Sequence, residues 1–311
     1  MIKPFLTYRQ QIQKLTMEKH LIIKDTAFAM EKLQDLGYFT LIGGYKEPFR
    51  DPTTRVYIGN TTFEDIYALY QFDSQLRELV FRYLCQIEKK ICSLISYAFC
   101  ERYGELQREY LDPMNYNYIF RNKNEINKLI QILDRVANRN TEHDYLVYQR
   151  CVYHNVPLWV AIHTLTFGQL SKMYSFLPSQ IQSKVSRCFD YVNERELEQY
   201  LKVLVLYRNV CAHGERLFSH KIYSEIPNTS LHRKLGIRQD GTQYICGKKD
   251  LFSVVIAFRY LLPKDDFRVF IKVLSKQIGR YLRRSKRISE KQLLATMGFP
   301  INWKTITRCK I

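Results

Sequence analysis

The longest helical pattern in the sequence, over residues 63–103, most limits what this chain can fold into. Thr61 or Thr62 can cap its first turn, and Gly104 follows its last residue. Because about forty residues is long for one globular helix, we expect a bend or break near residues 72–75. The apolar side chains recur every three or four residues, the repeat of one helix face, at Ile66, Leu69, Tyr70, Leu76, Val80, Leu84, Ile87, Ile91, Leu94, Ile95 and Ala98.

Shorter helical patterns fill most of the remaining chain. The 311 residues include only 12 Gly and 9 Pro, and alternating apolar residues are few, so we predict an all-α helical bundle. A loop is expected at residues 105–122, a plain turn at Gly43-Gly44 and a small hairpin around Gly247. The expected helices span residues 7–19, 25–36, 124–137, 145–154, 158–174, 180–191, 194–213, 250–262, 265–282 and the segment from 289.

The strongly basic charge of the chain indicates an anionic partner. The formal net charge is +18, which favours nucleic acid over a membrane because no amphipathic terminal anchor is evident. A merely basic, solvated surface is the alternative. Residues 271–311 hold eleven Lys and Arg against one Glu, and we expect their densest cluster to bind RNA phosphates: Arg280, Arg283, Arg284, Lys286 and Arg287.

Several function classes lack sequence support. The first residues have no signal-peptide core, and the longest apolar run, residues 251–262, is too short to span a bilayer and contains Arg259. The eight Cys form no C-x-x-C pair, which indicates a reducing compartment. Neither a metal-ligand cluster nor a P-loop occurs, since Thr242 stands where the Lys would follow Gly241. We therefore expect no metal and no cofactor.

One stretch, residues 203–214, combines groups suited to phosphate chemistry. An apolar helical run ends with Arg208, Asn209 and His213 before Gly214. On a helix Asn209 and His213 lie about 40° apart, whereas Arg208 and His213 lie about 140° apart, so the pair fits best in a groove between two helices. The alternative is that Arg and His complement the dipole of the helix end. Chance pairs at a shorter spacing also occur, as in Arg216/His220.

Three further side chains have both a functional and a structural interpretation. Glu88, followed by two Lys in mid-helix, either faces solvent or orients the Arg or His of the site. His163 lies among apolar residues and is expected to be a structural histidine, with Trp159 in the core. Asp73 and Arg77 are four residues apart and are expected to pair on the surface of the long helix.

Motifs along the chain resemble a known family. The Arg208-Asn-x-x-x-His213 motif is similar to the R-x(4–6)-H signature of HEPN domains, which are largely metal-independent RNases. The whole chain resembles the Abi-like family of the AbiD/AbiF type. Further motifs that carry this resemblance are Lys3-Pro-Phe-Leu-Thr-Tyr8, Leu36-Gly-Tyr-Phe39, Gly43-Gly-Tyr45, Tyr70-x-Phe-Asp-x-x-Leu-Arg77, Val156-Pro-Leu-Trp-Val-Ala-Ile162, Thr166-Phe-Gly168 and Gly298-Phe-Pro-x-Asn-Trp303.

The resemblance implies a cytoplasmic bacterial protein of phage defence by abortive infection, with an N-terminal helical segment (1–60), a HEPN-like bundle (61–214) and a basic extension (215–311). His213 would be the general acid/base, Arg208 would hold the scissile phosphate, and Asn209 would orient His213 or donate to the phosphate. Such nucleases join two motifs across an interface. This chain has one motif, so a homodimer with a composite site is expected, and an RNA or protein antitoxin is a possible partner. The alternatives are a non-catalytic protein bound to a structured small RNA and a structural scaffold.

Overall fold

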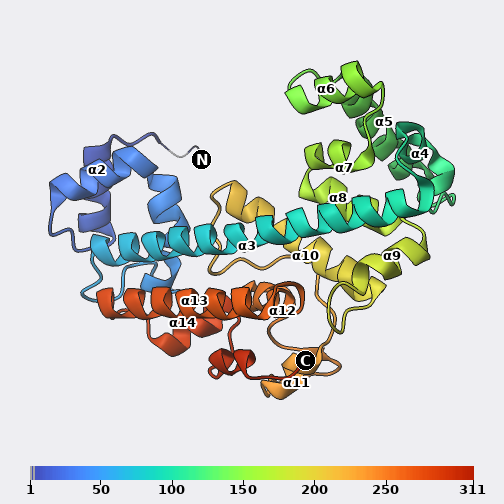
Figure 1. Cartoon of the computed structure of the whole chain (residues 1–311). Helices are drawn as coiled ribbons and strands as arrows, with labels where there is room; N and C mark the ends of the chain where they lie inside the picture. The colour runs from blue at the N-terminus through green and yellow to red at the C-terminus, as the bar shows by residue number, and fades with distance from the viewer. Residues whose placement is uncertain (1, 3) are drawn as a thin grey trace.

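A single helix, α3 (Phe63–Tyr103), forms the axis of the molecule (Figure 1). The computed structural model describes residue 2 and residues 4–311, so Lys3 of the first family motif lies outside it. Thr62 caps α3, because its side chain accepts the N–H of Asp65 and the Asp65 carboxylate accepts the N–H of Thr62. We predicted a bend or break at residues 72–75, and a break is wrong because α3 continues through them as one helix. Helices pack against α3 along its length, which sustains a span that an isolated helix would not.

The N-terminal helices pack around the first turns of α3. Thr7 and Asp25 cap α1 and α2, which confirms the helices predicted at 7–19 and 25–36. Gly43 and Gly44 were predicted to form a plain turn, but Gly43 ends a helical turn and Gly44 keeps helical angles. The elements are α1 (Tyr8–Gln13), the π-helical turns η1 (Lys14–Glu18) and η2 (Phe39–Gly43), α2 (Thr26–Leu36), and the 3-10 turn η3 (Glu47–Phe49).

A second group of helices surrounds the C-terminal half of α3 (Figure 1). The continuous helix predicted at 158–174 is wrong, because Leu165 is extended and Thr166 caps a new helix. Trp159 was predicted in the core but is 47% exposed. His163, predicted to be a structural histidine, is exposed, and its Nδ1 lies 3.9 Å from the Cys92 Sγ of α3. The elements are α4 (Gln107–Leu111), η4 (Pro113–Asn115), α5 (Lys123–Arg139), α6 (Asp144–Tyr153), α7 (Leu158–Ala161), η5 (Ile162–Thr164), α8 (Phe167–Phe176) and α9 (Ser179–Ser186).

The C-terminal third packs along the opposite side of α3, where α13 runs beside its N-terminal half (Figure 1). The hairpin predicted around Gly247 instead turns at Gly241-Thr242, with Asp240 opposite Gln243. Ser289 caps α14 through a capping box with Gln292, which confirms the helix predicted from residue 289. The elements are α10 (Glu194–Ala212), α11 (Ser230–Lys234), β1 (Gln239–Asp240), β2 (Gln243–Tyr244), α12 (Leu251–Leu261), α13 (Lys264–Arg284), α14 (Glu290–Met297) and η6 (Trp303–Thr307).

These elements confirm the all-α fold, since the sheet structure in the described residues consists of one two-stranded hairpin. Its apolar core runs continuously from the N-terminal helices through α3 to α14. Within residues 2 and 4–311, no helix has the length and apolarity needed to cross a bilayer.

Candidate functional site

The end of α10 carries the predicted catalytic residues. Asn193 caps the start of the helix, and His213 is its C-cap, with its N–H donating to the Asn209 carbonyl oxygen at 2.9 Å. Gly214 then takes a positive φ of 67°, which allows the chain to leave the helix sharply. The side chains of Asn209 and His213 are exposed and that of Arg208 is half-buried. The helix end therefore presents an amide and an imidazole to solvent on one face.

Arg208 is directed toward α3. Its Nε lies 3.9 Å from Oε2 of Glu88, and its guanidinium lies over the Phe81 ring at 5.9 Å. The Nε is buried and makes no hydrogen bond to the described chain, so the contact with Glu88 is an ion pair without a close hydrogen bond. Burial raises the pKa of Glu88, while the charge of Arg208 opposes this rise. Glu88, considered in the sequence as an orienting group, thus lies beside Arg208.

His213 lines a different space, a cavity of about 470 Å³ beside the η2 turn. Phe39, which is 89% exposed, and Gly43-Gly44 form one wall, and the segment after α10 forms the other. This segment brings Arg216 and His220 to the cavity. Burial lowers the pKa of His220, while Glu215 opposes this effect. From the sequence, Arg216 and His220 are interpreted as a chance pair. Their position just after the Arg208–His213 motif was the one sequence signal that they could lie near His213.

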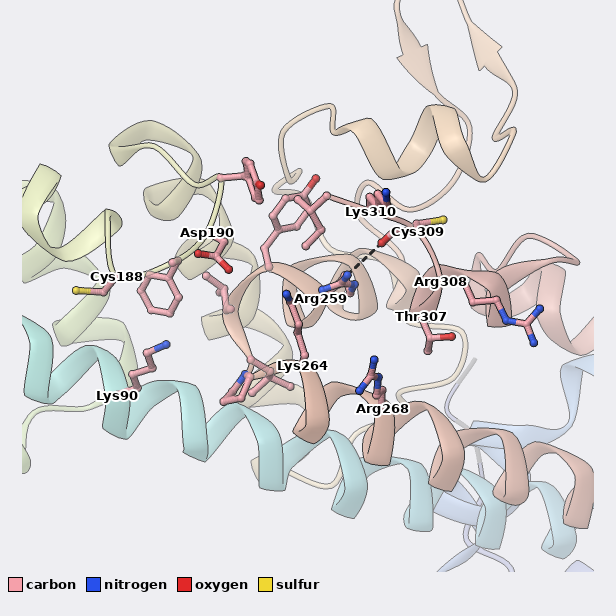
Figure 2. Close-up of a pocket in the computed structure, with 17 residues that line it drawn as sticks. Lys90, Cys188, Asp190, Arg259, Lys264, Arg268, Thr307, Arg308, Cys309 and Lys310 are labelled. Atoms are coloured by element: carbon pink, nitrogen blue, oxygen red, sulfur yellow. Dashed lines mark hydrogen bonds between the residues drawn. The ribbon is translucent and has the colours of Figure 1, made fainter.

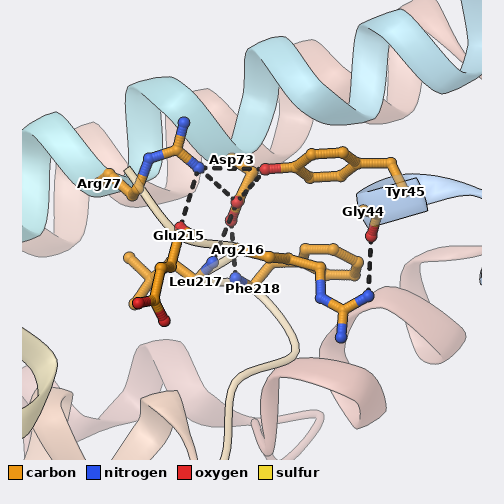
Figure 3. A network of polar contacts seen from close by, with 8 residues as sticks. All are labelled: Gly44, Tyr45, Asp73, Arg77, Glu215, Arg216, Leu217 and Phe218. Atoms are coloured by element: carbon orange, nitrogen blue, oxygen red, sulfur yellow. Dashed lines mark hydrogen bonds and ion pairs between the residues drawn. The ribbon is translucent and has the colours of Figure 1, made fainter. Parts of the chain in front are cut away.

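A buried network holds the segment after His213 in place (Figure 3). The carboxylate of Asp73 accepts four hydrogen bonds, from the Tyr45 hydroxyl at 2.7 Å, Arg77 at 2.7 Å, and the backbone N–H groups of Leu217 at 3.0 Å and Phe218 at 2.6 Å. Burial raises the pKa of Asp73, whereas these donors and the charge of Arg77 oppose the rise. One carboxylate thus joins α3, the end of the η2 turn and the segment after α10.

The Asp73–Arg77 pair was predicted on the surface and is instead buried. The side chains are 0% and 9% exposed, because η2 and the segment after α10 cover this face of α3. Arg77 also donates to the Glu215 carbonyl oxygen at 3.3 Å, and Arg216 donates to that of Gly44 at 2.7 Å. These bonds fix both walls of the His213 cavity relative to each other.

The basic cluster predicted to bind RNA lies elsewhere, at the C-terminal end of α13 and just beyond it. All five side chains are exposed. Arg284 bonds Gln71, and Arg287 lies 3.7 Å from Asp65. Asp65 precedes Glu88 by 23 residues on α3, which is about 35 Å along the helix axis. The structure does not bring this cluster together with Arg208.

The arrangement supplies a cation, an amide and an exposed imidazole at one end of α10. Within the described residues, no three His, Cys, Asp or Glu side chains gather to hold a metal ion. A guanidinium can neutralise a phosphate and an imidazole can transfer protons near neutral pH. No contact in the described chain joins Arg208 to His213, because the two side chains leave α10 in different directions.

Comparison with known proteins places the chain in a family. The family model described as Abi-like protein matches residues 31–219, more than half of the 311 residues. This match spans η2, the whole of α3 and the end of α10, and thus the Asp73 network and the lining of the His213 cavity except His220. Neither the curated proteins nor the solved structures contain a match. The chain therefore belongs to the Abi-like protein family.

Proposed function

We propose that this protein is a metal-independent endoribonuclease of antiphage defence by abortive infection. The observation that carries the proposal is the end of α10, where Asn209 and His213 are exposed on one face and Arg208 is held by Glu88. Family membership supports the defence role, since the family description suggests abortive infection. The net charge of +18 supports an RNA substrate.

The proposed reaction is an attack of the RNA 2′-oxygen on the adjacent phosphorus. One group takes the 2′-hydroxyl proton, the P–O5′ bond breaks, and a second group protonates the leaving O5′. The products are a 2′,3′-cyclic phosphate and a 5′-hydroxyl. His213 is the proton-transfer group, Arg208 neutralises the charge that grows on the phosphate, and Asn209 orients the imidazole or donates to the phosphate.

A two-fold dimer completes this site. Within one chain, the guanidinium of Arg208 faces Glu88 while His213 faces the η2 cavity. A second copy packed on the end of α10 brings Arg208, Asn209 and His213 of both chains to one interface, because an isologous contact repeats each residue. The two imidazoles then serve as base and acid. RNA is both the substrate and a candidate inhibitor of this toxin.

Host growth on induction of the protein tests these roles. His213→Ala is expected to abolish toxicity with an unchanged circular dichroism spectrum, because the side chain is exposed. His220→Gln is the matched control, since it removes an imidazole from the same cavity; it is expected to stay toxic. Arg208→Lys should fail, because an ammonium does not reproduce the guanidinium fork. A folded His213→Ala variant as toxic as wild type refutes the assignment.

The dimer has its own test. Mixing Arg208→Ala chains with His213→Ala chains leaves heterodimers with one intact Arg and one intact His, and these are expected to recover part of the RNA cleavage. Light scattering that shows an active monomer would refute the composite site. A protein that co-purifies with a structured small RNA and never cuts RNA would favour the non-catalytic RNA-binding function instead.

A further inference from the structure

A second cavity, of about 590 Å³, lies where α12, α13 and the last residues of the chain meet (Figure 2). It differs from the His213 cavity in position and composition. Lys90 of α3 contributes to it, two residues after Glu88, and two residues rotate a helix by about 200°. The cavity and the contact between Arg208 and Glu88 thus use nearly opposite faces of α3.

The cavity wall is basic. Among the described residues that line it, Asp190 is the single acid, against six bases: Lys90, Arg259, Lys264, Arg268, Arg308 and Lys310. They come from α3, α12, α13 and the C-terminal segment, so only folding gathers them. Pro263, the N-cap of α13, also lines the cavity and makes no side-chain cap hydrogen bond, and Asp265 and Asp266 follow in the first turn of the helix.

Few of these charges are neutralised by the protein. Arg268 pairs with Asp265 at 2.9 Å, while Lys90 lies over the Phe189 ring at 4.1 Å. Arg259 donates to the Cys309 carbonyl oxygen at 3.1 Å, but its Nε is buried and unbonded within the described chain. Burial lowers the pKa of Lys90 and of Arg259. Cations held close together repel one another, which costs electrostatic free energy, and a bound anion would lower this free energy.

The size and lining indicate more than a single phosphate. A volume of about 590 Å³ is within the range of small-molecule sites. Tyr191, which is 75% exposed, also lines the cavity and offers an aromatic face. We propose that this cavity binds a nucleoside phosphate, with the phosphates on Arg259, Lys264 and Arg268 and the base against Tyr191. The proposal is independent of the nuclease function.

Calorimetric titration of the full chain with ADP tests the site. We expect ADP to bind more tightly than pyrophosphate, and adenosine most weakly. The double variant Lys264→Glu/Arg268→Glu, at two exposed positions, should weaken ADP binding about tenfold or more. The control Lys272→Glu/Lys276→Glu changes two exposed lysines of α13 outside the cavity by the same total charge, and it should bind ADP as wild type does.

Two further comparisons define the ligand. Tyr191→Ala should weaken ADP about fivefold or more and leave pyrophosphate binding unchanged, because only the base stacks. RNA with a 5′-phosphate and RNA with a 5′-hydroxyl are each tested as competitors of ADP. Better displacement by the 5′-phosphate RNA identifies an RNA end as the ligand of the cavity, whereas equal displacement identifies the free nucleotide. The proposal is overturned if the wild-type protein binds no ADP at about 1 mM. It is also overturned if both double variants lose the same affinity for ADP.

Discussion

Removing the Asp73 carboxylate is the sharpest test of how the fold supports the site. Asp73→Ala deletes an acceptor of four hydrogen bonds and leaves the charge of Arg77, whose side chain is 9% exposed, without its ion-pair partner. Breaking a buried ion pair on one side typically costs 3–5 kcal/mol, so we expect the free energy of unfolding to fall by about 4 kcal/mol. The N–H groups of Leu217 and Phe218 also lose their acceptor.

Urea unfolding followed by circular dichroism measures this change. Tyr45→Phe removes a hydroxyl that donates to the Asp73 carboxylate and accepts from Arg77, and it should cost about 2 kcal/mol. Asp73→Leu/Arg77→Met should cost less than Asp73→Ala, because no buried charge remains unpaired. The control Glu78→Ala, at an exposed position of the same helix, should change stability by about 0.5 kcal/mol or less. A loss below about 1 kcal/mol for Asp73→Ala would contradict this account.

Three further predictions concern the chemistry and the pH dependence. RNA cleavage is expected to continue in excess EDTA and to leave 2′,3′-cyclic phosphate ends; activity that returns only with Mg²⁺ would contradict the mechanism. Glu88→Gln is expected to lower the rate of RNA cleavage with little loss of stability, because Arg208 loses its ion pair; an unchanged rate would remove Glu88 from the site. Burial lowers the pKa of His232 from 6.5 to about 4, so the unfolded chain binds more protons between these values. Stability should therefore fall by on the order of 3 kcal/mol as the pH drops through this window. His232→Gln should lose this slope relative to wild type, whereas Asp250, whose pKa burial raises to about 6, titrates in both proteins; equal slopes would contradict the assignment.

The sequence by itself determined the features that depend on local chemistry. The apolar stripe of α3, the capping residue Thr62, and Gly214 after α10 define helices without reference to the rest of the chain. The sequence also predicts that Arg208, Asn209 and His213 lie at a helix end, because the end of a helix depends on neighbouring residues in the chain.

Tertiary structure decided which helix faces are covered, because burial depends on elements far apart in the sequence. Asp73 looks like a surface residue until η2 and the segment after α10 close over it. Trp159 looks apolar enough for the core, but within α7 it is 47% exposed. The second cavity gathers bases from separate segments, and Glu88 reaches Arg208 only because α3 and α10 pack together. Helical periodicity gives each helix an apolar face, and the packing of those faces sets which polar groups meet.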